Sequence, residues 1–252
     1  MKKIFLMIIM AATVVACQNQ SVVKAYLDNN GDCIFENDII SYRINGASNP
    51  VVTSGMQAIF KAVVDKQDLV KDLKAGVSAS LNDGGSAIVV DDSLYFPQEN
   101  FSSFEIVEQT KGHVTFTLTY PEWQMGEDSI SLERTITIRE HSQYCEVSDI
   151  YTNNGESGRL MVAAGFVKHA VESSETGVDY MITWEDMPGS DEFFGLGIVM
   201  PMSDSLVFNG PCNSAVAYYP TKYGRKVDYA IGSCWDKAGF ATFDSWAEKV
   251  RL

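Results

Sequence analysis

The sequence is poor in basic residues and in histidine, and it lacks the motifs that mark several large enzyme classes. It holds 19 Lys and Arg against 33 Asp and Glu, a formal net charge of −14, and only three His. Such a charge repels nucleic acid and anionic membrane surfaces, so we expect no nucleic-acid partner. A glycine-rich phosphate loop, a G-x-S-x-G elbow and an H-E-x-x-H pair are all missing. Nucleotide enzymes, serine hydrolases of that type and zinc proteases therefore have no support, and we expect no cofactor.

Cysteine is also scarce, and its spacing offers no zinc knuckle. Besides Cys17 the chain has four cysteines, at Cys33, Cys145, Cys212 and Cys234. No two of them form a C-x-x-C pair, so we expect no structural metal. Two disulfides in any of three pairings agree with the sequence, and so do buried free thiols.

The N-terminal residues have the zones of a secretory signal. Lys2 and Lys3 supply the positive charge, and Ile4–Val15 form an apolar stretch. That stretch has about a dozen residues, which suits a signal peptide, whereas a span of the bilayer core needs about 20. The sequence therefore predicts a signal peptide over residues 1–16 and export of the remainder.

The predicted cleavage region is Val14-Val15-Ala16-Cys17. It resembles the lipobox of bacterial lipoproteins, in which a peptidase cuts before the cysteine and the thiol carries a diacylglycerol. The resemblance implies lipidation at Cys17 and a location on a bacterial membrane, periplasmic or at the outer-membrane surface, with the lipid as the only membrane contact. The alternative is an ordinary secreted protein in which Cys17 is incidental.

The full sequence has a globular composition, with 46% hydrophobic and 21% charged residues. The polar run after Cys17 predicts a lipidated tether over residues 17–32, followed by a single domain over 33–252. From Cys33 onward, short stretches alternate apolar and polar residues between Gly, Asn, Asp and Pro, which is the pattern of strands and turns. In addition to the hairpin described below, we expect strands at 34–44, 86–96, 103–109, 112–120, 160–167, 178–184, 194–199, 204–208, 214–219 and 227–233.

The clearest hairpin prediction joins strands 129–139 and 144–151 through a turn at 141–142. In that register every apolar residue on one face meets an apolar partner. The same register places Arg134 opposite Asp149 within the apolar row. A lone charge there is costly, so the two are either a structural ion pair or the floor of a polar cleft.

Two segments have the apolar spacing of helices, 57–74 and 240–250. The many strands dominate, and no repeat or linker is evident. The sequence therefore predicts an all-β fold, one large antiparallel β-sandwich with one or two short helices.

Four blocks resemble a bacterial envelope family described as domain of unknown function 4861. They are residues 36–46 (ENDIISYRING), 112–116 (GHVTF), 163–169 (AAGFVKH) and 235–240 (WDKAGF). Genes of this family often lie beside enzymes that dismantle plant and algal polysaccharides in Bacteroidetes. The resemblance thus implies a role in polysaccharide utilisation, with an oligosaccharide or polysaccharide as partner.

More distantly, the run 147–154 followed by 165–169 resembles the galactose mutarotase-like supersandwich of aldose epimerases. In that fold, a segment with glycine and then histidine lies in the sugar site, which implies a sugar site near His169. The Pro-Tyr that usually follows the first catalytic histidine is missing here, so epimerase chemistry itself is in doubt. The pattern also leads us to expect a further strand after the last helical segment.

His169 is the best single candidate for catalysis, because imidazole exchanges protons near neutral pH. Trp184 with the carboxylates of Glu185 and Asp186 is the second group. Aromatic rings stack on sugar rings, and carboxylates bind hydroxyls or move protons. A surface histidine and an acidic surface loop are the alternatives. The other two histidines, His113 and His141, are interpreted as structural and solvated.

Substrate binding is assigned to Arg43, Arg134, Tyr180 and Trp184, because lysis of a uronate chain needs a cation at the carboxylate and a base beside it. The predicted function is that of an envelope-anchored, carbohydrate-active protein acting on oligosaccharides. The candidate reactions are hydrolysis, elimination and epimerisation, by a glycoside hydrolase, polysaccharide lyase or sugar epimerase. The alternative is a non-catalytic glycan-binding lipoprotein.

Overall fold

The computed structural model describes residues 23–64, 67–73, 77–154 and 158–251. The predicted signal peptide and Cys17 lie outside these residues. Within them the chain forms three antiparallel sheets and one short α-helix, which confirms the predicted all-β sandwich. No helix in the described ranges is long and apolar enough to cross a membrane.

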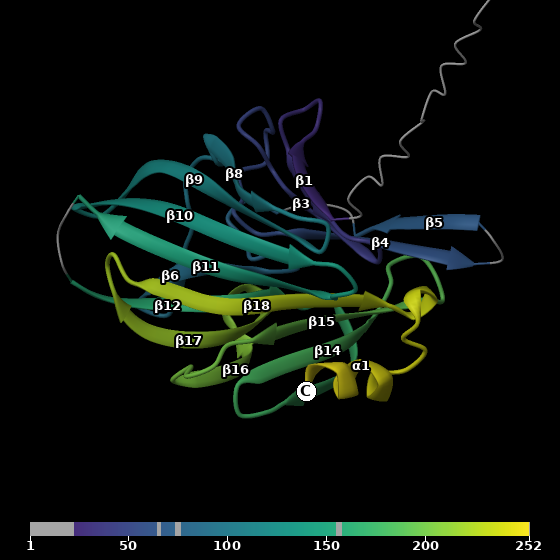
Figure 1. Ribbon diagram of the computed structural model, residues 1–252. Helices are drawn as coiled ribbons and strands as arrows, with labels where there is room; N and C mark the ends of the chain where they lie inside the picture. Colours follow the sequence, from purple (N-terminus) through teal and green to yellow (C-terminus); the bar gives the residue numbers. More distant parts are fainter. Residues whose placement is uncertain (1–22, 65–66, 74–76, 155–157, 252) are drawn as a thin grey trace, which may run out of the picture.

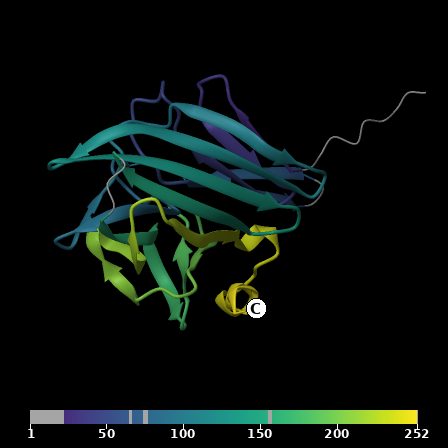
Figure 2. The same cartoon turned by 60° about the vertical axis from the view of Figure 1, so that its left-hand side comes forward.

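An eight-stranded antiparallel sheet runs through the molecule (Figure 1). Figure 2 shows that this sheet is strongly twisted and curved. In spatial order its strands are β13 (Ala170–Thr176), β14 (Tyr180–Asp186), β15 (Phe193–Val199), β18 (Lys226–Trp235), β11 (Tyr144–Asn153), β10 (Asp128–Arg139), β9 (His113–Met125) and β8 (Ser103–Gln109).

Two five-stranded sheets share a core with the eight-stranded sheet. The first consists of β1 (Lys24–Leu27), β2 (Cys33–Glu36), β3 (Ile40–Ile44), β4 (Gln57–Val64) and β5 (Gln67–Asp72). The second has the spatial order β16 (Ser205–Gly210), β17 (Ser214–Lys222), β12 (Arg159–Val167), β6 (Gly85–Val90) and β7 (Ser93–Tyr95). The core cluster contains Phe35 of the first sheet, Phe166 of the second and Phe116 of the eight-stranded sheet. One continuous apolar layer therefore joins all three sheets.

The opposite face of the eight-stranded sheet is covered at one end by α1 (Phe243–Val250). Trp246 is fully buried there and stacks on Tyr144, with ring centroids 5.6 Å apart. A Cβ atom at Gly195 would lie 2.7 Å from the Trp246 ring, so only glycine lets the helix approach this closely. The helix predicted at 240–250 is thus confirmed. The short 3-10 turns are η1 (Pro211–Asn213) and η2 (Asp236–Ala238).

The predicted hairpin is confirmed in its register as well as its position. β10 and β11 pair so that Leu132 faces Tyr151 and Ile136 faces Val147. Arg134 faces Asp149, as the alternation requires.

Two expectations about the N-terminal third are wrong. The predicted helix at 57–74 is the hairpin of β4 and β5, in which burial of Ala58 and Phe60 follows the two-residue period of a strand. The predicted tether over 17–32 is wrong for Lys24–Leu27, which form β1 and pair with β2. The cysteines that the structure describes, Cys33, Cys145, Cys212 and Cys234, are all free thiols.

Candidate functional site

The two five-stranded sheets meet at a seam beside the end of β12. Met56, just before β4, makes bridge contacts with Asn82 and Gly84. The Val167 N–H of β12 donates to the Asn82 carbonyl at 2.7 Å. The turn at residues 82–84 therefore connects the two five-stranded sheets and places Asp83 next to the residues that follow β12.

His169 lies at this seam, directly after β12, with about a third of its side chain exposed. Its Nε2 is 3.4 Å from Asp83 Oδ1. Asp83 is buried, and its other oxygen accepts from the Ala58 N–H at 2.8 Å. The imidazole also packs edge-on against Phe194 at 5.6 Å between centroids. The ring is thus held on one side by a carboxylate and on another by an aromatic wall.

A second carboxylate supports the main chain of His169. The His169 N–H donates to Glu185 Oε2 at 2.6 Å, and the Thr183 hydroxyl donates to Glu185 Oε1 at 2.6 Å. Glu185 is fully buried, and burial raises its pKa. Glu185 therefore holds the main chain at His169, and the catalytic role predicted for it has no support in these contacts.

The electrostatics of the seam favour the charged imidazole. The hydrogen bond that the His169 ring donates to Asp83 raises the pKa of His169, while burial acts in the opposite direction. A pKa above the ordinary value of about 6.5 increases the share of the charged imidazole near neutral pH. Imidazole is a side chain that can donate or accept a proton in a reaction.

His169 forms one wall of a pocket of about 270 Å³, here called the His169 pocket. Apart from His169, its polar lining comes from β5, and its apolar lining comes from the residues that directly follow β5 and β14. The other lining residues are Lys71, Asp72, Leu73, Met187 and Pro188. Such a mixture of charged and apolar groups suits a small polar ligand that also has an apolar face.

Arg43 reaches the edge of this pocket from β3. Its guanidinium lies 3.1 Å from Asp72 Oδ2 and donates to Gln57 Oε1 at 2.6 Å. Lys71 has a weaker attachment, since its Nζ is 3.7 Å from Glu192. Arg43 is thus engaged by two partners, whereas Lys71 is the cation with more freedom to meet a ligand.

Arg134 is not in this pocket. It is fully buried, with Nε and Nη2 each 2.8 Å from a different oxygen of Asp149. Nη1 donates to the Ser54 carbonyl, and Nη2 also donates to Ser86 Oγ at 3.2 Å. A guanidinium so enclosed has no side to offer a substrate. The predicted binding role of Arg134 is therefore wrong, and the structural ion pair is the alternative that the geometry matches.

Trp184 and Tyr180 lie on the opposite face of β14 from Glu185. Trp184 is almost entirely buried and stacks on Phe193 at 6.0 Å, in the cluster under α1. The Tyr180 hydroxyl donates to Glu175, away from His169. Alternation along the strand sends neighbouring residues to opposite faces, so neither ring joins the His169 pocket.

Asp186 is half-buried at the end of β14, paired across the sheet with Ala170 and Phe193. It does not line the His169 pocket. Three of the predicted site residues lie close together. Glu185 contacts the main chain of His169 directly, and Arg43 pairs with Asp72, which lines the same pocket as His169.

Asp83, Lys71 and Asp72 were not among the residues predicted from the sequence. Asp83 precedes Gly84-Gly85 and looks like a turn residue, so its link to a histidine 86 positions later has no local signal. Lys71 and Asp72 fell in the segment that was interpreted as a helix. Among the described residues, no group of three His, Cys, Asp or Glu could hold a metal ion.

The fold and the pocket define an antiparallel β-sandwich protein with a carboxylate-supported histidine. The family model for a domain of unknown function, DUF4861, matches residues 73–251. The chain belongs to this family, and Asp83, His169 and Glu185 all lie within the matched segment. Lys71 and Asp72 immediately precede it.

No curated protein matches the sequence. Among solved structures, one similar chain comes from the human microbiome and bears a provisional assignment as a kojibiose phosphorylase. It is 8% identical, with a TM-score of 0.42, over 89% of this chain and 32% of that chain. The chain thus spans about a third of the length of that structure.

Proposed function

We propose that this chain is an exported, lipid-anchored, carbohydrate-active protein that transfers a proton to or from an oligosaccharide at His169. The observation that carries the proposal is the imidazole held by Asp83 at the wall of a small pocket. The polar and apolar lining matches a sugar, which presents hydroxyls at its rim and C–H groups on its faces. The resemblances in the sequence add the link to polysaccharide utilisation.

The roles of the residues follow from their contacts. With Nε2 facing Asp83, Nδ1 is the ring nitrogen left to exchange a proton with a ligand. Glu185 fixes the main chain at His169, so the imidazole needs little rearrangement during the reaction. Lys71 supplies a positive charge that can meet a carboxylate or a developing oxyanion.

Elimination or epimerisation fits this pocket better than hydrolysis. Hydrolysis by the usual route needs two carboxyl groups on either side of the glycosidic bond. Among the described residues, the pocket lining has one carboxylate, Asp72, and Arg43 engages it. Removal of a proton from carbon needs one base and a nearby cation, which His169 and Lys71 provide.

The test uses the chain beginning at Gln18 with a panel of plant and algal oligosaccharides. Products are followed by chromatography and by the ultraviolet absorbance of unsaturated uronates. We expect turnover of at least one glycan and its loss, by at least about 100-fold, in His169→Ala. An absorbance rise identifies elimination.

The matched control is His113→Ala, because His113 also faces a carboxylate, Glu108 at 3.3 Å, but lies at the start of β9. This variant should keep full turnover. Turnover that survives in His169→Ala would contradict the proposed site.

A non-catalytic glycan-binding protein is the second candidate. The observation in its favour is that Glu185, a carboxylate predicted for catalysis, is buried and engaged by two donors. Retention of a glycan on the native chain, without product from any member of the panel, would establish this function instead.

A further inference from the structure

The hairpin of β4 and β5 projects from the same end of the molecule at which β1 begins (Figure 1). Antiparallel pairing aligns Lys24 with Glu36, Ser41 and Ile59 in one row across the first sheet. The end of β4 therefore extends beyond that row on the side from which the chain enters β1. Lys24 and Lys61 both form ion pairs with Glu36, which ties the hairpin to the chain start.

One face of this hairpin exposes aliphatic side chains. Val63 is 72% exposed and Val70 is 67% exposed. Cross-strand pairing joins Val70 to Lys61 and Val63 to Asp68, so these four residues share one face. We call it the hairpin face. Val63 and Val70 lie in neighbouring cross-strand rows, so the two exposed side chains are close together.

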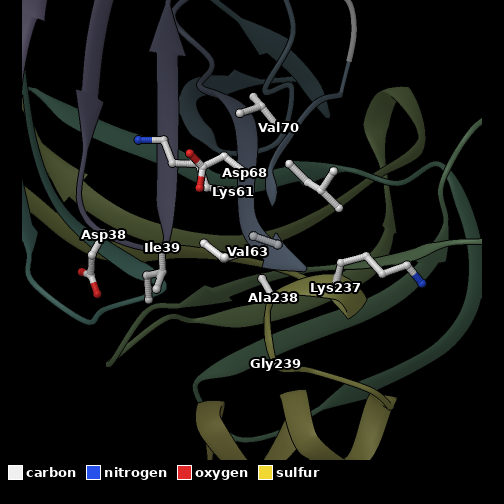
Figure 3. A pocket seen from close by; sticks show the side chains of 11 residues that line it. Asp38, Ile39, Lys61, Val63, Asp68, Val70, Lys237, Ala238 and Gly239 are labelled. Atoms are coloured by element: carbon white, nitrogen blue, oxygen red, sulfur yellow. The ribbon is translucent and has the colours of Figure 1, made fainter. Parts of the chain in front are cut away.

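A hollow of about 420 Å³ lies beside the hairpin and is lined by residues of both its faces, 61–63 and 68–70 (Figure 3). Its other wall is made by Asp38 and Ile39 and by Lys237–Gly239. Ile39, Ala62, Leu69 and Ala238 pack against the core, so the exposed aliphatic groups are Val63 and Val70, which share their face with Lys61 and Asp68. Exposed aliphatic side chains with a lysine beside them suit the boundary between lipid headgroups and acyl chains.

We propose that the hairpin face rests on the lipid bilayer to which Cys17 is anchored. This inference depends on the lipid-anchor part of the proposed function and is independent of the chemistry at His169. Cys17 precedes Val23, the first described residue, by six positions, so a fully extended chain separates them by at most about 21 Å. The bilayer must therefore lie close to the end of the molecule from which the hairpin projects.

Contact at the hairpin face also orients the His169 pocket. Val70 of the hairpin face and Lys71 of the pocket are neighbours on β5. A hairpin fixed on the bilayer therefore holds the pocket at a defined height above the lipid, although the tether alone would leave it free to rotate.

The test attaches an environment-sensitive fluorophore at position 63 of the acylated full-length chain. The variant is Val63→Cys in a Cys212→Ser background, since Cys212 is exposed. The chain is reconstituted in vesicles of the uncharged lipids phosphatidylethanolamine and phosphatidylcholine that contain nitroxide-labelled lipid, because the net charge of −14 would repel an anionic surface. We expect a blue-shifted emission and at least twofold quenching at position 63.

Val178→Cys is the matched control, because Val178 is 95% exposed on the turn before β14. Asp186 pairs with Phe193, and the next residue, Phe194, pairs with Trp235, which directly precedes η2. The Asp186 end of β14 is therefore the end nearest η2. Position 178 therefore lies at the end of the sheet away from the hairpin. Equal quenching at the two positions, or none at position 63, would overturn the proposal.

The lipid anchor is measured separately by the intact mass of the chain and by fatty-acid labelling. Cys17→Ala should abolish both the acyl mass and the quenching at position 63. An acylated chain without quenching overturns the hairpin proposal alone, whereas an unacylated native chain overturns the anchor and the hairpin proposal together. Neither outcome affects the turnover test at His169.

Discussion

Arg134 with Asp149 and His169 with Asp83 are both pairs of a basic group and an aspartate, yet the structure uses them differently. The Arg134 pair is fully buried, and the Tyr229 hydroxyl donates a further hydrogen bond to Asp149 at 2.9 Å. The His169 pair has one long contact of 3.4 Å and an imidazole that borders a pocket. Exposure and spare hydrogen-bonding capacity, more than the identity of the residues, separate a structural pair from one that can exchange a proton.

The largest expected effect comes from breaking the buried pair. Arg134→Met leaves the Asp149 carboxylate without its cation in the core, so the free energy of unfolding should fall by about 3–5 kcal/mol. Urea denaturation measures this loss. The comparison fails if the variant is as stable as the native chain.

Arg139→Met is the matched control on the same strand. Arg139 pairs with Glu146 at 3.2 Å, but the two side chains are 51% and 61% exposed. Exposed pairs contribute at most about 1 kcal/mol, so this variant should unfold close to the native midpoint.

Glu185 sharpens the comparison, because it is a buried carboxylate held by neutral donors. Burial raises the pKa of Glu185, so the folded state keeps its proton to a higher pH than the unfolded state does. Stability from this group is therefore lost as pH rises from about 4.5 through the raised pKa. Glu185→Gln cannot titrate, and its stability relative to the native chain should increase over that range. Thermal unfolding from pH 4 to 8 measures the difference, and parallel curves would contradict it.

The change that is most informative for function, with a smaller expected effect on stability than Arg134→Met, is Asp83→Asn. Asp83 raises the pKa of His169, so the substitution should lower it. In the native chain the stability from this pair is complete below about pH 6.5 and is lost as pH rises through the pKa of folded His169. NMR titration of the imidazole protons measures the shift, and the rising limb of the pH–rate profile should move to lower pH with it.

His141 is the internal control for that titration. His141 lies at the turn between β10 and β11, and the hydrogen bond that its ring donates to Asp38 raises its pKa. This resonance should not move in Asp83→Asn. A common shift of both histidines would show that the substitution disturbs the fold and not one pair.

The β10–β11 hairpin could be predicted in detail because strand alternation is a local property. Once Ile136 is matched with Val147, the two-residue period places Arg134 opposite Asp149. The segment 57–74 was misinterpreted because its apolar residues also fit a helical spacing. Val63 and Val70, two residues of that apolar pattern, are exposed, and the strand instead buries Phe60 against the core.

The site could be predicted only in part. His169 was selected as a catalytic candidate from its type and position, and Glu185 as a second one from its neighbours; the structure brings the two into contact. Alternation along β14 separates Glu185 from Trp184, so the apparent aromatic and carboxylate group is divided between two faces of the sheet. Asp83 and Lys71 reach His169 through sheet packing, which leaves no trace in the local pattern.

The antiparallel β class, the pairing of Arg134 with Asp149, the family and the negative net charge could all be predicted from the amino-acid sequence. These properties depend on residue type and on short-range periodicity. The packing of the sheets was needed to show that Arg134 is enclosed, that Glu185 supports the chain at His169, and that Asp83 holds the imidazole. Burial and long-range contacts arise when three sheets pack on one core, and distant segments then supply the partners that set each group's pKa and accessibility.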